Sequence, residues 1–169
     1  HMVIEEDQPT VLGGHFTFRE VHNIYTASEA KIITWLRHPV ERVISNYKWR
    51  THLNILQKMD KPLPDFESFI HKKKNINRIQ RFLEGKNISE FDFIGFQHRM
   101  KEDIQLLAKT LQWTDYNYFH VNAISNIKLP KIEIHSDMID AISALNQADI
   151  ELYQEALSLR KIKAPHREY

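Results

Sequence analysis

The chain contains no cysteine, which excludes disulfide bonds, thiolate-bound metals and thiol-based catalysis together. A chain without cysteine suits a reducing compartment, so we expect a cytoplasmic protein, or one of the Golgi lumen if the source is an animal. No apolar run approaches the roughly 18 residues that a membrane span requires, and the start has no signal-peptide core. We therefore expect a soluble protein without a membrane span.

A marked excess of charge of either sign is also missing. The 23 Lys and Arg residues nearly balance the 22 Asp and Glu residues, which leaves a net charge of +1. Such a chain has no overall field that attracts nucleic acid or an anionic membrane, so any anion site must be local. Internal repeats and Gly/Ser-rich linkers are absent too. We predict one domain over residues 3–169, with His1 and Met2 left from cloning.

What the chain does contain is an alternation of strand-like and helical patterns. Short runs of β-branched and aromatic residues predict buried strands at residues 10–12, 31–36, 91–95 and 116–121. One-sided helical patterns lie between them and after them. They comprise Val40, Val43, Ile44 and Tyr47, then Ile104, Leu107, Ala108 and Leu111, and finally the segment 136–161. Strands that alternate with helices predict an α/β fold with a parallel sheet.

The last of these segments carries its own end signals. Ser136 is suited to the N-cap of a helix, because its side chain can accept a hydrogen bond from a first-turn N–H group. Lys and Arg residues stand at the other end, where positive charge complements the helix dipole. We predict one helix over residues 136–161.

The corner at residues 36–39 is the first candidate for function. Pro39 fits the first position of a helix, so the strand ending at Leu36 should pass directly into that helix. A helix that begins at the carboxyl end of a parallel strand favours anions, because its first N–H groups are unpaired. Ser45 lies about 9 Å along the axis from Pro39, within reach of an Arg37 side chain folded back along the helix. The alternative is that Arg37 only pairs with Glu41 and Ser45 has no role.

The string "LRHPVERVISNY" at this corner closely resembles the 3′-phosphate-binding segment of a sulfotransferase family. These enzymes use 3′-phosphoadenosine 5′-phosphosulfate (PAPS). The likeness is greatest to their carbohydrate branch, with its heparan sulfate 2-O-sulfotransferase-like and bacterial members. Four further strings resemble family segments in the same order, and the likeness extends over residues 14–156. They are "GGHFTF", "NRIQRFL", "FDFIGFQHRMKEDIQLL" and "DIELYQEA".

The resemblance implies a fold and a reaction. It implies a three-layer α/β sandwich with a parallel sheet and a P-loop-like sulfotransferase topology. It also implies transfer of a sulfuryl group from PAPS to a hydroxyl of a carbohydrate, without a metal. Arg37 and Ser45 would bind the 3′-phosphate of the nucleotide. His15 would act as the catalytic base, since a hydroxyl attacks sulfur well only when its proton leaves.

Two departures from the family pattern qualify these expectations. His38 stands where the family usually has Asp, which removes a helix cap and a carboxylate. The family's first strand and its Lys-containing 5′-phosphosulfate loop have no counterpart in residues 3–12. We therefore expect a fold that is incomplete at its N-terminus, with self-association as one way to cover the missing strand. The alternative function is a non-catalytic, sulfotransferase-like module that binds an anionic glycan or a partner protein; a nucleotide kinase ranks last.

Other charged residues give weaker signals. No two of the ten histidines lie within four positions of each other, so no metal site is predicted. Residues 72–74, Arg78 and Arg81 form a basic cluster that either meets an acidic glycan or is a solvated face. Arg50 and Arg99 are lesser candidates for binding substrate anions, with pairing to Glu or Asp as the alternative.

Overall fold

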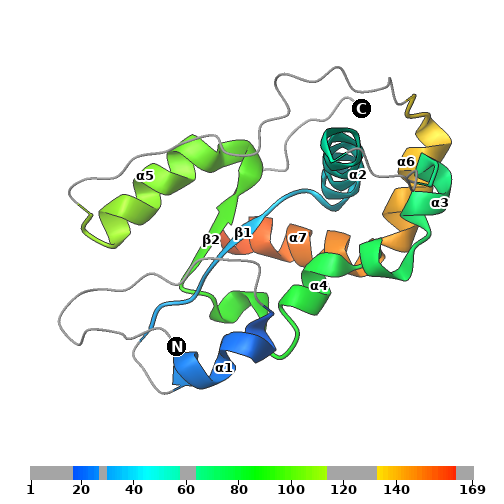
Figure 1. The fold of residues 1–169 in the computed structure, drawn as a ribbon. Coiled ribbons are helices and arrows are strands. Elements are labelled where there is room, and N and C mark those ends of the chain that lie inside the picture. The colour runs from blue at the N-terminus through cyan, green and yellow to red at the C-terminus, as the bar shows by residue number, and fades with distance from the viewer. Residues whose placement is uncertain (1–16, 27–29, 58–63, 114–132, 163–169) are drawn as a thin grey trace.

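The computed structural model describes residues 17–26, 30–57, 64–113 and 133–162 (Figure 1). Within these residues the protein is a mixed α/β structure, mostly helical, with a small parallel sheet. The predicted strands at residues 10–12 and 116–121 lie outside the described residues, and so does His15.

The sheet of the described residues has two strands, β1 (Ile33–Leu36) and β2 (Phe93–Phe96). They pair in parallel, with Ile33 opposite Phe93 and Leu36 opposite Phe96, and lie side by side in Figure 1. This confirms the strands predicted at residues 31–36 and 91–95 and their parallel pairing. The carboxyl ends of both strands lie at the same edge of the sheet, where open α/β proteins place their binding residues.

Trp35 and Gly95 form a close cross-strand pair in the sheet. They are opposite each other in the register, so both point to the same face. A Cβ atom added to Gly95 would lie 2.1 Å from Trp35 Cε3, well inside any allowed contact. The indole therefore occupies the space that a side chain at position 95 would need.

The other face of the sheet packs against helices. Leu36, Ile94 and Phe96 contact α4 (Arg78–Phe82) and α7 (Gln147–Leu159) in one apolar cluster. Among the residues that α7 contributes, Tyr153 is 2% exposed and Ala156 is fully buried. Burial of apolar side chains at about 25 cal/mol per Å² is the main force that holds the sheet on these helices.

A second apolar cluster holds three helices together beside the sheet. It joins α2 (Pro39–Leu56), α3 (Phe66–Ile70) and α6 (Ser136–Leu145), seen grouped in Figure 1. Val40, Val43 and Ile44 of α2 are buried, as the helical pattern predicts. Tyr47 completes that face at the edge of the cluster, half-buried against the rings of α3.

Helix α5 (Met100–Thr110) follows β2 through a 3-10 turn, η3 (Gln97–Arg99). It confirms the helical pattern predicted for Ile104, Leu107, Ala108 and Leu111, although Leu111 directly follows its last residue. Asp103 is 1% exposed and accepts a hydrogen bond from Phe96 N at 2.8 Å. It also pairs with Arg160 Nη2 at 2.9 Å, so one buried carboxylate connects α5, the end of β2 and the end of α7.

The single helix predicted over residues 136–161 is wrong, because the chain forms α6 and α7 with a break at Asn146. Asn146 leaves the helical conformation, and its Nδ2 donates to Ile142 O at 2.8 Å. Its Oδ1 accepts from Asn77 N at 3.0 Å, so a distant segment stabilises the break. Ser136 is also not the N-cap: it is the first residue of α6, and His135 precedes it without a capping side-chain bond.

The remaining described elements are short. They are α1 (Phe18–Thr26) and the 3-10 turns η1 (Lys73–Asn75) and η2 (Ile88–Glu90). None of the helices in the described ranges combines the length and the apolar character that a bilayer crossing would require.

Candidate anion site

The strand-to-helix corner has the form that the sequence predicts. β1 ends at Leu36, Arg37 and His38 make the turn, and α2 begins at Pro39. His38 has a non-helical backbone, and its side chain makes no capping hydrogen bond to α2. Arg42 N donates to His38 O at 2.9 Å, which starts the helical ladder. The first turn of α2 therefore lies at the carboxyl edge of the sheet without a side-chain cap.

Arg37 folds back along α2 and contacts both residues that the sequence offered as partners. Its Nη1 donates to Ser45 Oγ at 2.7 Å, and its Nε lies 3.7 Å from Glu41 Oε2. Arg37 thus contacts Ser45 and Glu41 at the same time. One guanidinium brings together a hydroxyl and a carboxylate that are four residues apart on one side of the helix. We call Arg37, Glu41 and Ser45 the open flank of α2.

The guanidinium of the open flank has spare hydrogen-bonding capacity. Its side chain is 36% exposed, yet its Nε is buried and makes no hydrogen bond. Burial lowers the pKa of Arg37 from its ordinary value, which still leaves an arginine charged at neutral pH. A half-buried arginine with a hydroxyl beside it is suited to a phosphate or sulfate group, because both side chains can donate to its oxygens.

The end of β2 adds a pair that the sequence did not single out. His98 Nδ1 lies 3.2 Å from the hydroxyl of the buried Tyr153, and the ring of His38 packs edge-on against the same tyrosine. Burial, followed by the charge of Arg99, lowers the pKa of His98 below its ordinary value. The two strands therefore deliver Arg37, His38 and His98 to one edge of the sheet.

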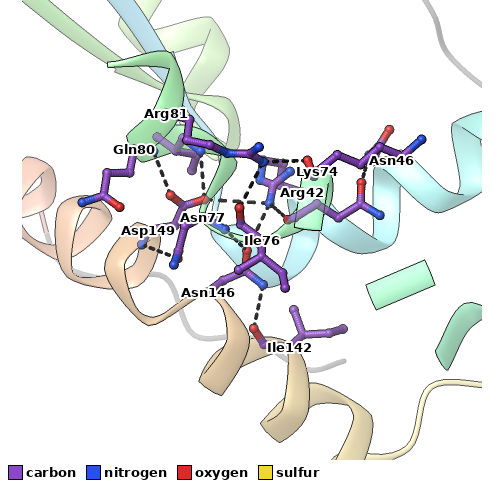
Figure 2. Close-up of polar contacts among 12 residues, drawn as sticks. Arg42, Asn46, Lys74, Ile76, Asn77, Gln80, Arg81, Ile142, Asn146 and Asp149 are labelled. Atoms are coloured by element: carbon purple, nitrogen blue, oxygen red, sulfur yellow. Dashed lines mark hydrogen bonds and ion pairs between the residues drawn. The ribbon is translucent and has the colours of Figure 1, made fainter. Parts of the chain in front are cut away.

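Arg42 lies on the other side of α2, where it reaches into a network of polar contacts (Figure 2). Its side chain is only 15% exposed. Its Nη2 donates to Asn75 O at 2.8 Å and to Asn146 Oδ1 at 3.2 Å, and lies 3.8 Å from Asp149 Oδ2. Asn46, one turn along, donates to Asn75 Oδ1 at 3.4 Å. We call Arg42 and Asn46 the closed flank of α2.

Asp149 is the anionic centre of this network and is fully buried. Its two oxygens accept hydrogen bonds from Ile79 N and Gln80 N at 2.9 and 2.8 Å, so it caps the start of α4. In turn, Asn77 Oδ1 accepts a hydrogen bond from Asp149 N, at the start of α7, at 3.2 Å. Each of two helix starts thus receives a side-chain acceptor from the other, as Figure 2 shows.

The pKa of Arg42 is lowered to about 10, mainly by burial. The nearby carboxylate of Asp149 raises this pKa, whereas the charges of Arg78 and Arg81 lower it further. The residue therefore remains a cation at neutral pH, and its hydrogen bonds are charge-assisted. Its partners are all parts of the protein. The closed flank is thus a structural clamp rather than a site for a ligand.

The other predicted candidates divide between structure and surface. Arg99 Nε lies 3.8 Å from Asp103 Oδ1, which supports the pairing alternative for Arg99. Arg81 Nη2 donates to the carbonyls of Lys74 and Ile76, whereas the three lysines of residues 72–74 are exposed. Arg50 makes no ion pair within the described part of the chain, so the pairing alternative fails for it there. No group of residues suited to a metal ion is present in the described ranges.

The residues missed by sequence reasoning had only faint signals. Asn77 and Asn146 each precede a helix, in the strings "NINR" and "NQAD", where asparagine is a common cap. His98 follows β2 by two residues, a position that the edge rule for parallel sheets would have marked.

Comparisons of the chain with protein-family models, with curated proteins and with solved structures found no match.

Proposed function

We propose that this chain is a sulfotransferase domain that binds PAPS and transfers its sulfuryl group to a carbohydrate hydroxyl, within the three-layer sandwich that the resemblance implies. The observation that supports this most is the hydrogen bond between Arg37 Nη1 and Ser45 Oγ at 2.7 Å. In the resembled family, the residues at these two positions bind the 3′-phosphate together. A contact between them is what that role requires, because both must reach one tetrahedral anion.

The described residues fit a nucleotide phosphate at the open flank. Arg37 supplies a fixed charge on a side chain that is 36% exposed, and Ser45 supplies a hydroxyl on the same side of α2. The neighbouring start of α2 adds the positive end of its dipole. Glu41 opposes the anion, so the site gains its selectivity from geometry more than from net charge.

The reaction needs a base and a leaving nucleotide. PAPS supplies the sulfuryl group: the acceptor oxygen bonds to sulfur, and the bond from sulfur to the 5′-phosphate oxygen breaks. Under the proposal His15 takes the hydroxyl proton, and Arg37 and Ser45 keep the nucleotide in place as 3′-phosphoadenosine 5′-phosphate departs. Loss of such a base costs about 10²- to 10⁴-fold in rate.

The test compares two nucleotides that differ only at the 3′ position. Titration calorimetry of 3′-phosphoadenosine 5′-phosphate and of adenosine 5′-phosphate should show a preference of about tenfold or more for the first. Arg37→Ala should abolish that preference, and Ser45→Ala should reduce it. Equal affinity of the two nucleotides for the unaltered chain, or an unchanged preference in Arg37→Ala, would remove Arg37 from the proposed role.

The non-catalytic alternative is separated by a second measurement. A chain that binds the 3′-phosphate but transfers no labelled sulfuryl group from PAPS to sugar hydroxyls would be a binding module rather than an enzyme. Arg37→Lys is a useful companion variant. It keeps the charge but removes the planar donor geometry, and it should lose most of the preference.

A further inference from the structure

A cavity of about 780 Å³ opens between α7 and the segment that runs from α4 to η2. Its lining combines buried or half-buried apolar side chains with exposed carboxylates. The first group is Leu83, Ile88 and Leu152, and the second is Glu84, Glu90, Glu151 and Glu155. We call this cavity the acidic groove, and we propose that it receives the lysine turn, Lys72–Lys74, of a second copy of the chain in a symmetric dimer.

Only one carboxylate of the acidic groove is paired with a cation in the described part of the chain. Glu90 lies 3.9 Å from Lys86 Nζ, and the Lys86 side chain is only 6% exposed. Glu84, Glu151 and Glu155 make no ion pair with any described residue. Glu151 and Glu155 are one turn apart, so their charges lie on one side of α7. The groove therefore presents negative charge to solvent.

The lysine turn carries the opposite charge. Lys72 leads into η1, and Lys73 and Lys74 are its first two residues. All three are exposed, and none makes an ion pair within the described ranges. No Asp or Glu occurs in residues 68–83, so the surrounding sequence supplies no compensating charge. Three adjacent ammonium groups repel one another, and a surface rich in carboxylates relieves that repulsion.

Arg81 joins the two features into one surface. It lines the acidic groove, and its Nη2 donates to Lys74 O at 2.8 Å and to Ile76 O at 3.1 Å (Figure 2). The lysine turn therefore lies next to the part of the groove that Arg81 lines. Positive and negative regions side by side on one surface are self-complementary. A two-fold axis between them places the turn of each copy on the groove of the other.

A lysine side chain has the chemistry that the groove requires. Its methylene stem covers apolar residues such as Leu83 and Leu152, while its ammonium group meets a carboxylate. A second copy supplies this contact twice, because the two-fold axis repeats it. Association through exposed opposite charges is reversible and weakens as salt is added. The interface is separate from the open flank of α2 and does not depend on PAPS binding.

The test reverses the charges of the two surfaces. Sedimentation equilibrium of the unaltered chain at low salt, at concentrations up to about 1 mM, should show dimers that dissociate when salt is added. The turn variant carries Lys73→Glu and Lys74→Glu, and the groove variant carries Glu84→Lys and Glu155→Lys. Each should weaken the dimer by about tenfold or more, because like charges then face each other.

A mixture of the two variants is the decisive sample. In a mixed dimer the acidic turn of one variant meets the basic groove of the other, and the second contact keeps its original charges. The mixture should therefore dimerise about as tightly as the unaltered chain. The control variant, Lys101→Glu with Lys109→Glu, reverses two exposed charges on α5 and should change the dimer affinity by less than about twofold.

Several outcomes would overturn the interface. They are a monomer at every concentration of the unaltered chain, a mixture that does not associate, equal weakening by the control variant, and an assembly larger than a dimer. The reversed positions are all exposed, so circular dichroism should show an unchanged fold. If one charge reversal unfolds the chain, Lys74→Gln and Glu155→Gln replace it, and an unchanged dimer affinity in both would equally overturn the interface.

Discussion

The two flanks of α2 carry arginines only five residues apart with opposite uses. Arg37 on the open flank is 36% exposed and has one hydroxyl and one carboxylate partner, both on the helix that directly follows it. Arg42 on the closed flank is 15% exposed, and its partners come from residues 33 to 107 positions away. The difference teaches that burial and the origin of the partners, rather than residue type, decide whether an arginine holds the fold or faces a ligand.

The largest effect is expected from the carboxylate behind the closed flank. Asp149→Ala removes the cap from Ile79 N and Gln80 N and leaves Arg42 buried without its ion-pair partner. We expect a loss of about 3–5 kcal/mol in the free energy of unfolding, measured with denaturant. Glu151→Ala, an exposed carboxylate on the same helix, is the control and should cost less than about 0.5 kcal/mol. Similar losses in the two variants would show that the network does not hold α4 and α7 together.

Next in size is the direct contrast between the two arginines. Arg42→Ala should cost about 2–4 kcal/mol of unfolding free energy, because two charge-assisted hydrogen bonds and an ion pair disappear from a buried site. Arg37→Ala should cost less than about 1 kcal/mol, since a partly exposed ion pair contributes little. Denaturant midpoints of both variants measure the contrast directly. Equal losses would mean that Arg37 also has a structural role.

The smallest effect concerns the carboxylate of the open flank. Glu41→Gln removes the negative charge beside Arg37 while its size is preserved. We expect the affinity for 3′-phosphoadenosine 5′-phosphate to rise by roughly two- to fivefold at low salt, and stability to change by under about 0.5 kcal/mol. The gain should fall as salt is added, because exposed charges are screened. A weaker affinity would show that Glu41 orients Arg37 rather than competing for it.

Local patterns were sufficient to predict much of the described fold. Pro39 marks the start of α2, the apolar spacing identifies its buried face, and both strands were found with their parallel direction. The contact between Arg37 and Ser45 was also within reach, because it depends on helix geometry over eight positions. These features are encoded by residues close together in the chain.

The closed flank could not be predicted in the same way. Apolar spacing identifies the buried, apolar face of α2, but it does not reveal that Asn75, Asn146 and Asp149 pack against the polar side. The break between α6 and α7 has the same origin. Asn146 leaves the helix where Asn77 and Arg42 bind its side chain, and neither is near it in the sequence.

The pairing of Trp35 with Gly95 restricts how this sheet can vary. The two positions share the volume of one large side chain, so an alanine at position 95 has room only if a smaller residue replaces the indole. Substitutions at these sites should therefore be tolerated jointly and not singly. A search for distant relatives can use that joint restriction as a signature, independent of any catalytic residue.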